Sequence, residues 1–165
     1  NTAAKADMVS ETSRKLAIGQ MRCLNYYASE ILKDYEVHGC TDVTGFSLAG
    51  HALEMAEGSQ VTIKIDTKKI PFLPDVEEYA KMGLVPEGTY RNKEFLREKI
   101  KLNDTIKESF EDLLFDPQTS GGLLVSLKKK DAKEVLKRLQ EQEQTRYSKI
   151  VGEVEEKQEV HLIFL

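Results

Sequence analysis

The sequence has few of the residues that build disulfide-stapled or metal-stapled proteins: of 165 residues, two are cysteine and three are histidine. Cys23 and Cys40 lack metal-ligand spacing, which argues against a zinc site and favours reduced thiols in a cytoplasmic protein. No apolar run approaches the roughly 20 residues that cross a bilayer, and no signal peptide is recognisable, so no membrane association is expected. The length predicts one domain that buries its own core.

The sequence also lacks an excess of basic residues. Twenty-four lysines and arginines stand against 28 acidic residues, which gives a net charge of −4. This balance argues against a nucleic-acid partner. With 32% charged and 40% hydrophobic residues, the composition is typical of a soluble globular domain.

Hydrophobic periodicity predicts an α+β fold, in which helices pack on a mixed β-sheet. Residues 1–13 are small and polar without a period, so we expect a loose linker remnant there and a single domain over residues 14–165. Residues 85–92 are expected to form a turn-rich loop, and residues 92–109 short helical pieces. Helices are predicted over 21–35, 46–57, 75–81 and 131–140, and strands over 37–43, 60–66, 123–127, 148–154 and 158–165.

The stretch HGCTDVTGFSLAGH, residues 38–51, is predicted to be a strand-to-helix turn with its corner at Thr44 and Gly45. Thr44 can accept a hydrogen bond from a free amide of the first helical turn, and Gly45 tolerates a backbone conformation that side chains disfavour. Asp42 then lies beside a helix N-terminus, which suits a carboxylate that holds a cation. The alternative is that Asp42 and Thr44 merely cap the helix.

A second polar stretch, residues 116–122, leads into the predicted strand 123–127. The backbone amides of this loop could line a ligand cleft. The alternative is a tight turn in which the glycines only allow close packing of neighbouring elements.

Two other reactive side chains are interpreted as structural. Cys40 is expected to be a small buried hydrophobic residue of its strand rather than a nucleophile. His51 is expected to be a packed residue, because no acid–base partner is spaced to orient it. His38 and His161 receive the same interpretation.

The strings CTDVTGFSLAGH and DPQTSGGLL, residues 40–51 and 116–124, resemble two signatures of the selenophosphate synthetases, TDVTGFGLxGH and DPQTSGGLL. The likeness extends over nearly the whole chain but corresponds only to the C-terminal half of those enzymes. It implies a C-terminal domain of the aminoimidazole ribonucleotide synthetase type whose first partner is its own N-terminal domain. The family's catalytic cysteine or selenocysteine belongs to that N-terminal half, so no catalytic residue is assigned here.

The resemblance implies an enzyme that converts selenide, ATP and water to selenophosphate, AMP and phosphate. It implies Mg²⁺ and ATP bound in a site shared between the two domains, with Asp42 as a metal ligand. Thr41, Thr44 and Gly45 would support that acid, and Thr119, Ser120 and Gly121 would contribute to cofactor binding. The full-length enzyme is expected to be a homodimer joined through its N-terminal half, and the chain alone a monomer without activity.

Ser47 departs from the family signature, which has glycine at this position. Because serine is the better helix former, the change is predicted to stiffen the helical turn. Two other functions remain open. One is another ATP-dependent enzyme of the superfamily, such as a thiamine-phosphate or hydrogenase-maturation enzyme, and the other is a non-catalytic binding or assembly module.

Overall fold

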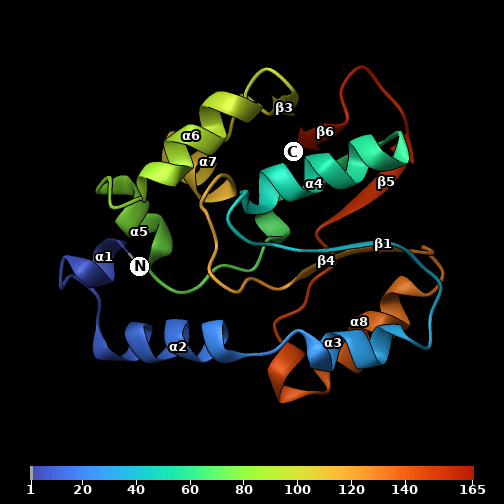
Figure 1. Ribbon diagram of the computed structural model, residues 1–165, viewed down its shortest axis with the longest axis horizontal. Coiled ribbons are helices and arrows are strands. Elements are labelled where there is room, and N and C mark those ends of the chain that lie inside the picture. Colours follow the sequence, from blue (N-terminus) through green and yellow to red (C-terminus); the bar gives the residue numbers. More distant parts are fainter. Residues whose placement is uncertain (1) are drawn as a thin grey trace.

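The computed structural model describes residues 2–165; Asn1, the first residue of the predicted linker, lies outside the described part. Figure 1 shows how helices and strands alternate along the chain. The elements are α1 (Thr2–Lys5), α2 (Glu11–Arg22), α3 (Tyr26–Leu32), β1 (Val37–Asp42), α4 (Ser47–Ser59), β2 (Val61–Ile65), η1 (Thr67–Lys69), α5 (Val76–Lys81), α6 (Glu87–Leu96), β3 (Ile100–Leu102), α7 (Glu108–Leu114), β4 (Leu123–Leu127), α8 (Ala132–Gln140), η2 (Glu143–Thr145), β5 (Gly152–Glu156) and β6 (Leu162–Phe164).

The strands form two sheets. A four-stranded mixed sheet has the order β3-β6-β2-β5, with β6 parallel to β3 and β2 and with β5 antiparallel to β2. β1 and β4 form a separate antiparallel ribbon in which Asp42 pairs with Leu123. The predicted α+β class is confirmed, and the division into two sheets is a feature that the sequence pattern did not indicate.

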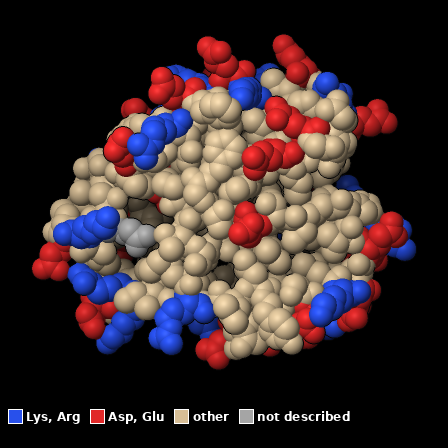
Figure 2. All heavy atoms as spheres, viewed as in Figure 1, with Lys and Arg blue, Asp and Glu red and all other residues tan. Residues whose placement is uncertain are grey.

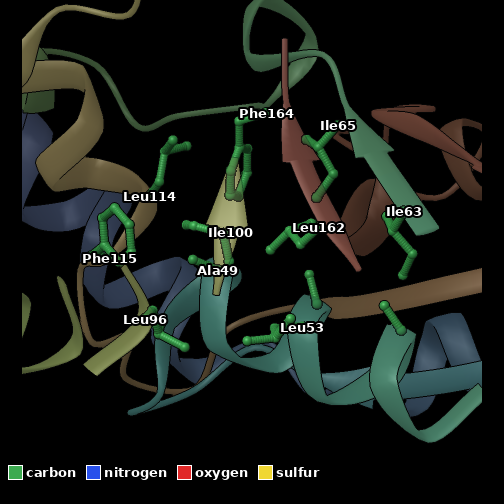
Figure 3. Packing of buried hydrophobic residues seen from close by; sticks show 12 residues of the cluster. Ala49, Leu53, Ile63, Ile65, Leu96, Ile100, Leu114, Phe115, Leu162 and Phe164 are labelled. Carbon is green, nitrogen blue, oxygen red and sulfur yellow. The ribbon is translucent and has the colours of Figure 1, made fainter. Parts of the chain in front are cut away.

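Helix α4 lies between the four-stranded sheet and the ribbon (Figure 1). Its core-facing side is made of small residues and one leucine, and these side chains are almost completely buried: Ala49, Ala52, Leu53 and Ala56. They pack against sheet residues such as Ile65, Leu162 and Phe164 (Figure 3). Burial of each large side chain contributes about 1.5–3 kcal/mol before entropy is counted. The core therefore fixes the position of α4 and of the turn that precedes it.

The predicted loose segment at the start of the chain is not irregular. Within residues 2–13 the chain forms α1 and the first turn of α2, whose N-cap Ser10 accepts a hydrogen bond from the Ser13 amide at 3.1 Å. A side-chain cap of this kind satisfies one free amide of the helix end. The predicted helix over 21–35 is also interrupted: α2 ends at Arg22 and α3 begins at Tyr26.

Two more predictions of local structure are corrected. The expected loop over 85–92 is largely helical, because α6 begins directly after Pro86. The strand predicted over 148–154 is shifted to β5 (Gly152–Glu156), and it does not pair with β6, since β2 lies between β5 and β6. Thr62 of β2 secures their connection: its buried hydroxyl donates to the Val160 carbonyl at 2.7 Å and accepts from the Gln158 amide at 2.8 Å.

Ser47, the first residue of α4, has a φ of +69°. This left-handed conformation is easy for glycine and costs other residues about 1–2 kcal/mol. The Ser47 side chain is completely buried, and its hydroxyl accepts a hydrogen bond from the Gly50 amide at 3.3 Å. The prediction that serine stiffens this turn is therefore wrong, because it assumed an ordinary helical conformation.

The conformation of Ser47 gives a test by substitution. Ser47→Ala loses the buried hydrogen bond and keeps the strained backbone, so we expect a loss of about 1–2 kcal/mol in unfolding free energy. Ser47→Gly loses the same bond but relieves the strain, and should be about 1 kcal/mol more stable than the alanine variant. Urea unfolding measures both. An alanine variant more stable than the glycine variant would indicate an ordinary helical residue.

Candidate functional site

The two motif loops meet at one end of the β1–β4 ribbon (Figure 1). The Val43 amide donates to the Gly122 carbonyl at 2.9 Å, and the Gln118 amide donates to the Thr44 carbonyl at 3.0 Å. These bonds continue the ladder of the ribbon beyond its last residue pair. The loop after β1 and the loop before β4 consequently form one joined unit, which we call the loop junction.

Gly121 is the point of closest approach within the loop junction. A Cβ atom at this position would lie 1.8 Å from the Val43 carbonyl oxygen, whereas a Cβ at Gly122 would meet no atom within 4 Å. Only a residue without a side chain allows the two backbones to come this close. The packing interpretation of the glycine pair is therefore supported for Gly121.

Two asparagine side chains hold the loop junction from outside. The Asn92 amide group, on α6, donates to the carbonyl oxygens of Gly45 at 3.1 Å and Phe115 at 3.0 Å. The Asn25 amide group donates to the Gly121 carbonyl at 3.1 Å. Both roles were missed from the sequence, because Asn92 was assigned to a loop and Asn25 to the interior of a continuous helix over 21–35.

Asp42 is exposed at the end of β1, and no described side chain or amide donates a hydrogen bond to its carboxylate. Across the part of the chain that the structure describes, no cluster of three histidine, cysteine or acidic residues could hold a metal ion. Magnesium needs six oxygen ligands and usually takes one or two protein carboxylates. Asp42 therefore fits the role of a single ligand, and this chain does not build a complete metal site.

Cys40 lies on the same face of β1 as Asp42, two residues earlier. Partial burial, together with the negative charge of Asp42, raises the pKa of the Cys40 thiol. Since the thiolate is the reactive form, this environment disfavours a nucleophile. The cysteine is nevertheless exposed rather than buried, so the prediction of a buried hydrophobic residue is wrong.

The three residues predicted to support Asp42 take different positions. Thr41 points to the opposite face of β1, and its hydroxyl donates to the Asp42 carbonyl at 3.2 Å. Gly45 is exposed, and its backbone φ is not positive. The Thr44 side chain does not cap α4. Its carbonyl accepts from the Ser47 amide at 2.9 Å, while its hydroxyl hydrogen-bonds to His51.

His51 has partners on both ring nitrogens. Nε2 lies 3.1 Å from the Thr44 hydroxyl oxygen, and Nδ1 lies 3.1 Å from a carboxylate oxygen of Glu54. The Phe46 ring packs edge-on against the His51 ring, with ring centroids 6.0 Å apart and an interplanar angle of 88°. The expectation that no partner orients His51 is wrong. The signal was available, because residues three apart on a helix share a face.

The second loop presents Thr119 and Ser120 to solvent, with Ser120 in a left-handed conformation at φ +52°. Asp116, at the start of the loop, is largely buried. Burial raises the pKa of Asp116 to about 6, although a hydrogen bond from the Gln118 side chain opposes this shift. A carboxyl group with a pKa raised toward neutral pH is typical of functional sites, and no pattern in the sequence marks Asp116 as one.

Residues 4–164 match the family described as "AIR synthase related protein, C-terminal domain". The match covers nearly the whole chain, and the chain therefore belongs to this family.

More specific relatives are named "Selenide, water dikinase". One, from Clostridium botulinum (strain Eklund 17B / Type B), is 47% identical over 157 residues, covering 95% of this chain and 45% of the relative. Another, from Caldanaerobacter subterraneus subsp. tengcongensis, is 47% identical over 160 residues, covering 96% of this chain and 46% of the relative. The chain thus spans about half the length of the curated relatives it matches.

Solved structures support the fold alone. The crystal structure of E. coli HypE, a hydrogenase maturation protein, superimposes with a TM-score of 0.57 at 20% identity, over 82% of this chain and 34% of HypE. A chain of the crystal structure of the HypE-HypF complex gives a TM-score of 0.54 at 20% identity, over 86% of this chain and 38% of that one.

The two glycines of the second loop form a matched pair for mutation. Gly121→Ala forces the Val43 carbonyl to move, so we expect a loss of at least about 2 kcal/mol in unfolding free energy. Gly122→Ala meets open space and should change it by no more than about 0.5 kcal/mol. Chemical denaturation measures both. Equal effects of the two substitutions would contradict the close approach at Gly121.

Asp116 gives a prediction for pH. Its pKa in the folded chain, about 6, lies above the value of an unfolded aspartate, so ionisation of Asp116 lowers the stability of the folded state. The parent should therefore lose stability relative to Asp116→Asn as the pH rises from about 4 to 7, by about 2–3 kcal/mol. Denaturation at both pH values measures this difference. Asp104→Asn, which removes an exposed charge, is the control, and a difference for Asp116→Asn that does not change with pH would contradict the assignment.

Proposed function

We propose that this chain is the C-terminal domain of a selenide, water dikinase and contributes Asp42 to a Mg²⁺–ATP site shared with its own N-terminal domain. The observation that carries the proposal is the position of Asp42: an exposed carboxylate without a described partner, at a junction of two signature loops. Relatives with that name, 47% identical across nearly all of this chain, support the reaction class.

The proposed reaction consumes ATP, selenide and water and releases selenophosphate, AMP and phosphate. Bound Mg²⁺ would neutralise phosphate charge while it keeps several water ligands. Asp42 would supply one carboxylate ligand, and the exposed side of Thr119 and Ser120 would face the nucleotide. No nucleophile is proposed in this chain, since the environment of Cys40 disfavours the thiolate.

A partner domain is supported by the surface next to the loop junction. Helix α2 has no buried residue, and apolar side chains such as Ile18, Leu24 and Tyr26 are exposed around its C-terminal end and the start of α3. Figure 2 shows that charged side chains gather mostly around the rim of this view, while its middle, where β1 and β4 run in Figure 1, is largely uncharged apart from isolated acidic side chains. A face of this kind suits a second domain.

The remaining parts of the proposal concern the whole enzyme. We propose a homodimer joined through the N-terminal half, so that this chain alone is monomeric and inactive. A cytoplasmic location agrees with two free cysteines. Within residues 2–165, no helix is long and apolar enough to cross a membrane.

Asp42→Asn tests the proposed function. Asparagine has nearly the same size, so the unfolding free energy of the chain should stay within about 0.5 kcal/mol of the parent. In the full-length enzyme the same change should lower selenide-dependent AMP release by orders of magnitude, because a neutral amide oxygen is a poor magnesium ligand. Asp104→Asn is the control. Near-normal AMP release from Asp42→Asn would reduce Asp42 to a structural role.

A further inference from the structure

Three side chains form a hydrogen-bonded row from the surface of α4 to the corner of the first motif. Glu54 contacts His51 Nδ1, and His51 Nε2 contacts Thr44 Oγ1, each at 3.1 Å. Glu54 is 60% exposed at its side chain, whereas the His51 side chain is only 15% exposed. The row therefore leads from solvent into a partly buried position within the loop junction.

The chemistry of the partners decides which atom carries each proton. An ionised carboxylate can only accept a hydrogen bond, so Nδ1 of His51 must carry a hydrogen and donate it in the hydrogen bond to Glu54. In the neutral ring Nε2 is then an acceptor, and the Thr44 hydroxyl donates a hydrogen bond to it. The only hydrogen of Thr44 Oγ1 is directed at His51, and this oxygen can present only lone pairs to any other neighbour.

The surroundings restrict the ring to this arrangement. Phe46 packs edge-on against His51, and its own ring lies over Gly50, where a Cβ atom would come within 2.5 Å of Phe46 Cγ. Phe95 contacts the Phe46 ring at a centroid distance of 5.7 Å. The Thr44 carbonyl is fixed by the amides of Ser47 and Gln118. The hydroxyl and the imidazole are thus both held on rigid supports.

We infer that His51 is a positioning residue that, oriented by Glu54, keeps the Thr44 hydroxyl as a hydrogen-bond acceptor in the loop junction. This inference rests on the proposed function for the identity of the ligand. An acceptor two residues from Asp42 suits the water ligands of a hydrated magnesium ion, which donate hydrogen bonds, and disfavours phosphate oxygens, which only accept. Thr44 would thereby help to orient the metal rather than the phosphates.

The tautomer of His51 can be measured on the chain without ligand. Side-chain ¹⁵N NMR of the parent, at a pH where the ring is neutral, should show a protonated Nδ1 and an unprotonated Nε2. Glu54→Ala should raise the population of the other tautomer, in which Nε2 carries the proton. Glu54→Gln keeps an acceptor oxygen and should retain the parental tautomer. A parent ring protonated at Nε2, or a Glu54→Ala spectrum identical to that of the parent, would overturn the inference.

The functional arm uses the full-length enzyme. Glu54→Ala should weaken the apparent affinity for Mg²⁺–ATP by about 10-fold or more, the usual effect of losing an outer hydrogen-bond partner. Glu54→Gln should restore most of it. Unchanged affinity in Glu54→Ala, despite an altered tautomer, would also overturn the positioning role. Failure of the proposed function is separate: it would appear as normal AMP release from Asp42→Asn, with the tautomer measurements unaffected.

Discussion

The close approach of the Gly121 backbone to the Val43 carbonyl is the constraint on which the candidate site depends. It lets the amides of Val43 and Gln118 reach carbonyls of the opposite loop, and so joins two signatures that are separated in sequence by residues 52–115. Backbone hydrogen bonds of this kind leave side chains free for other tasks. Asp42 can therefore remain exposed, with no hydrogen-bond donor to its carboxylate among residues 2–165, while its position is fixed.

Helix α4 connects this junction to the stability of the whole fold. Its small, buried side chains, such as Ala49 and Ala52, rest on the four-stranded sheet, and its first residue, Ser47, turns the chain through a left-handed conformation. His51, on the same helix, forms a hydrogen bond with the side chain of Thr44, at the corner before the helix. The core thus determines where the loop residues stand, and a change in the packing of α4 is transmitted directly to them.

Local pattern was enough for part of the fold. The alternation of Val61, Ile63 and Ile65 predicted β2, and the regular stripe of α8 predicted that helix, because the apolar residues of each recur at the spacing that places them on one face. Pattern could not show that the strands divide into two sheets, since pairing depends on distant partners. It also missed the left-handed Ser47 and the role of Asn92, which follow from tertiary contacts. The metal role of Asp42 came from the family signature and stays a prediction.

The most direct test of the account is a crystal structure of the full-length enzyme with Mg²⁺ and a non-hydrolysable ATP analogue. The account predicts an Asp42 carboxylate oxygen about 2.0–2.1 Å from a magnesium ion that also contacts the phosphates, with the remaining protein ligands from the N-terminal domain. A structure in which all magnesium ligands come from elsewhere, and Asp42 faces solvent, would contradict it.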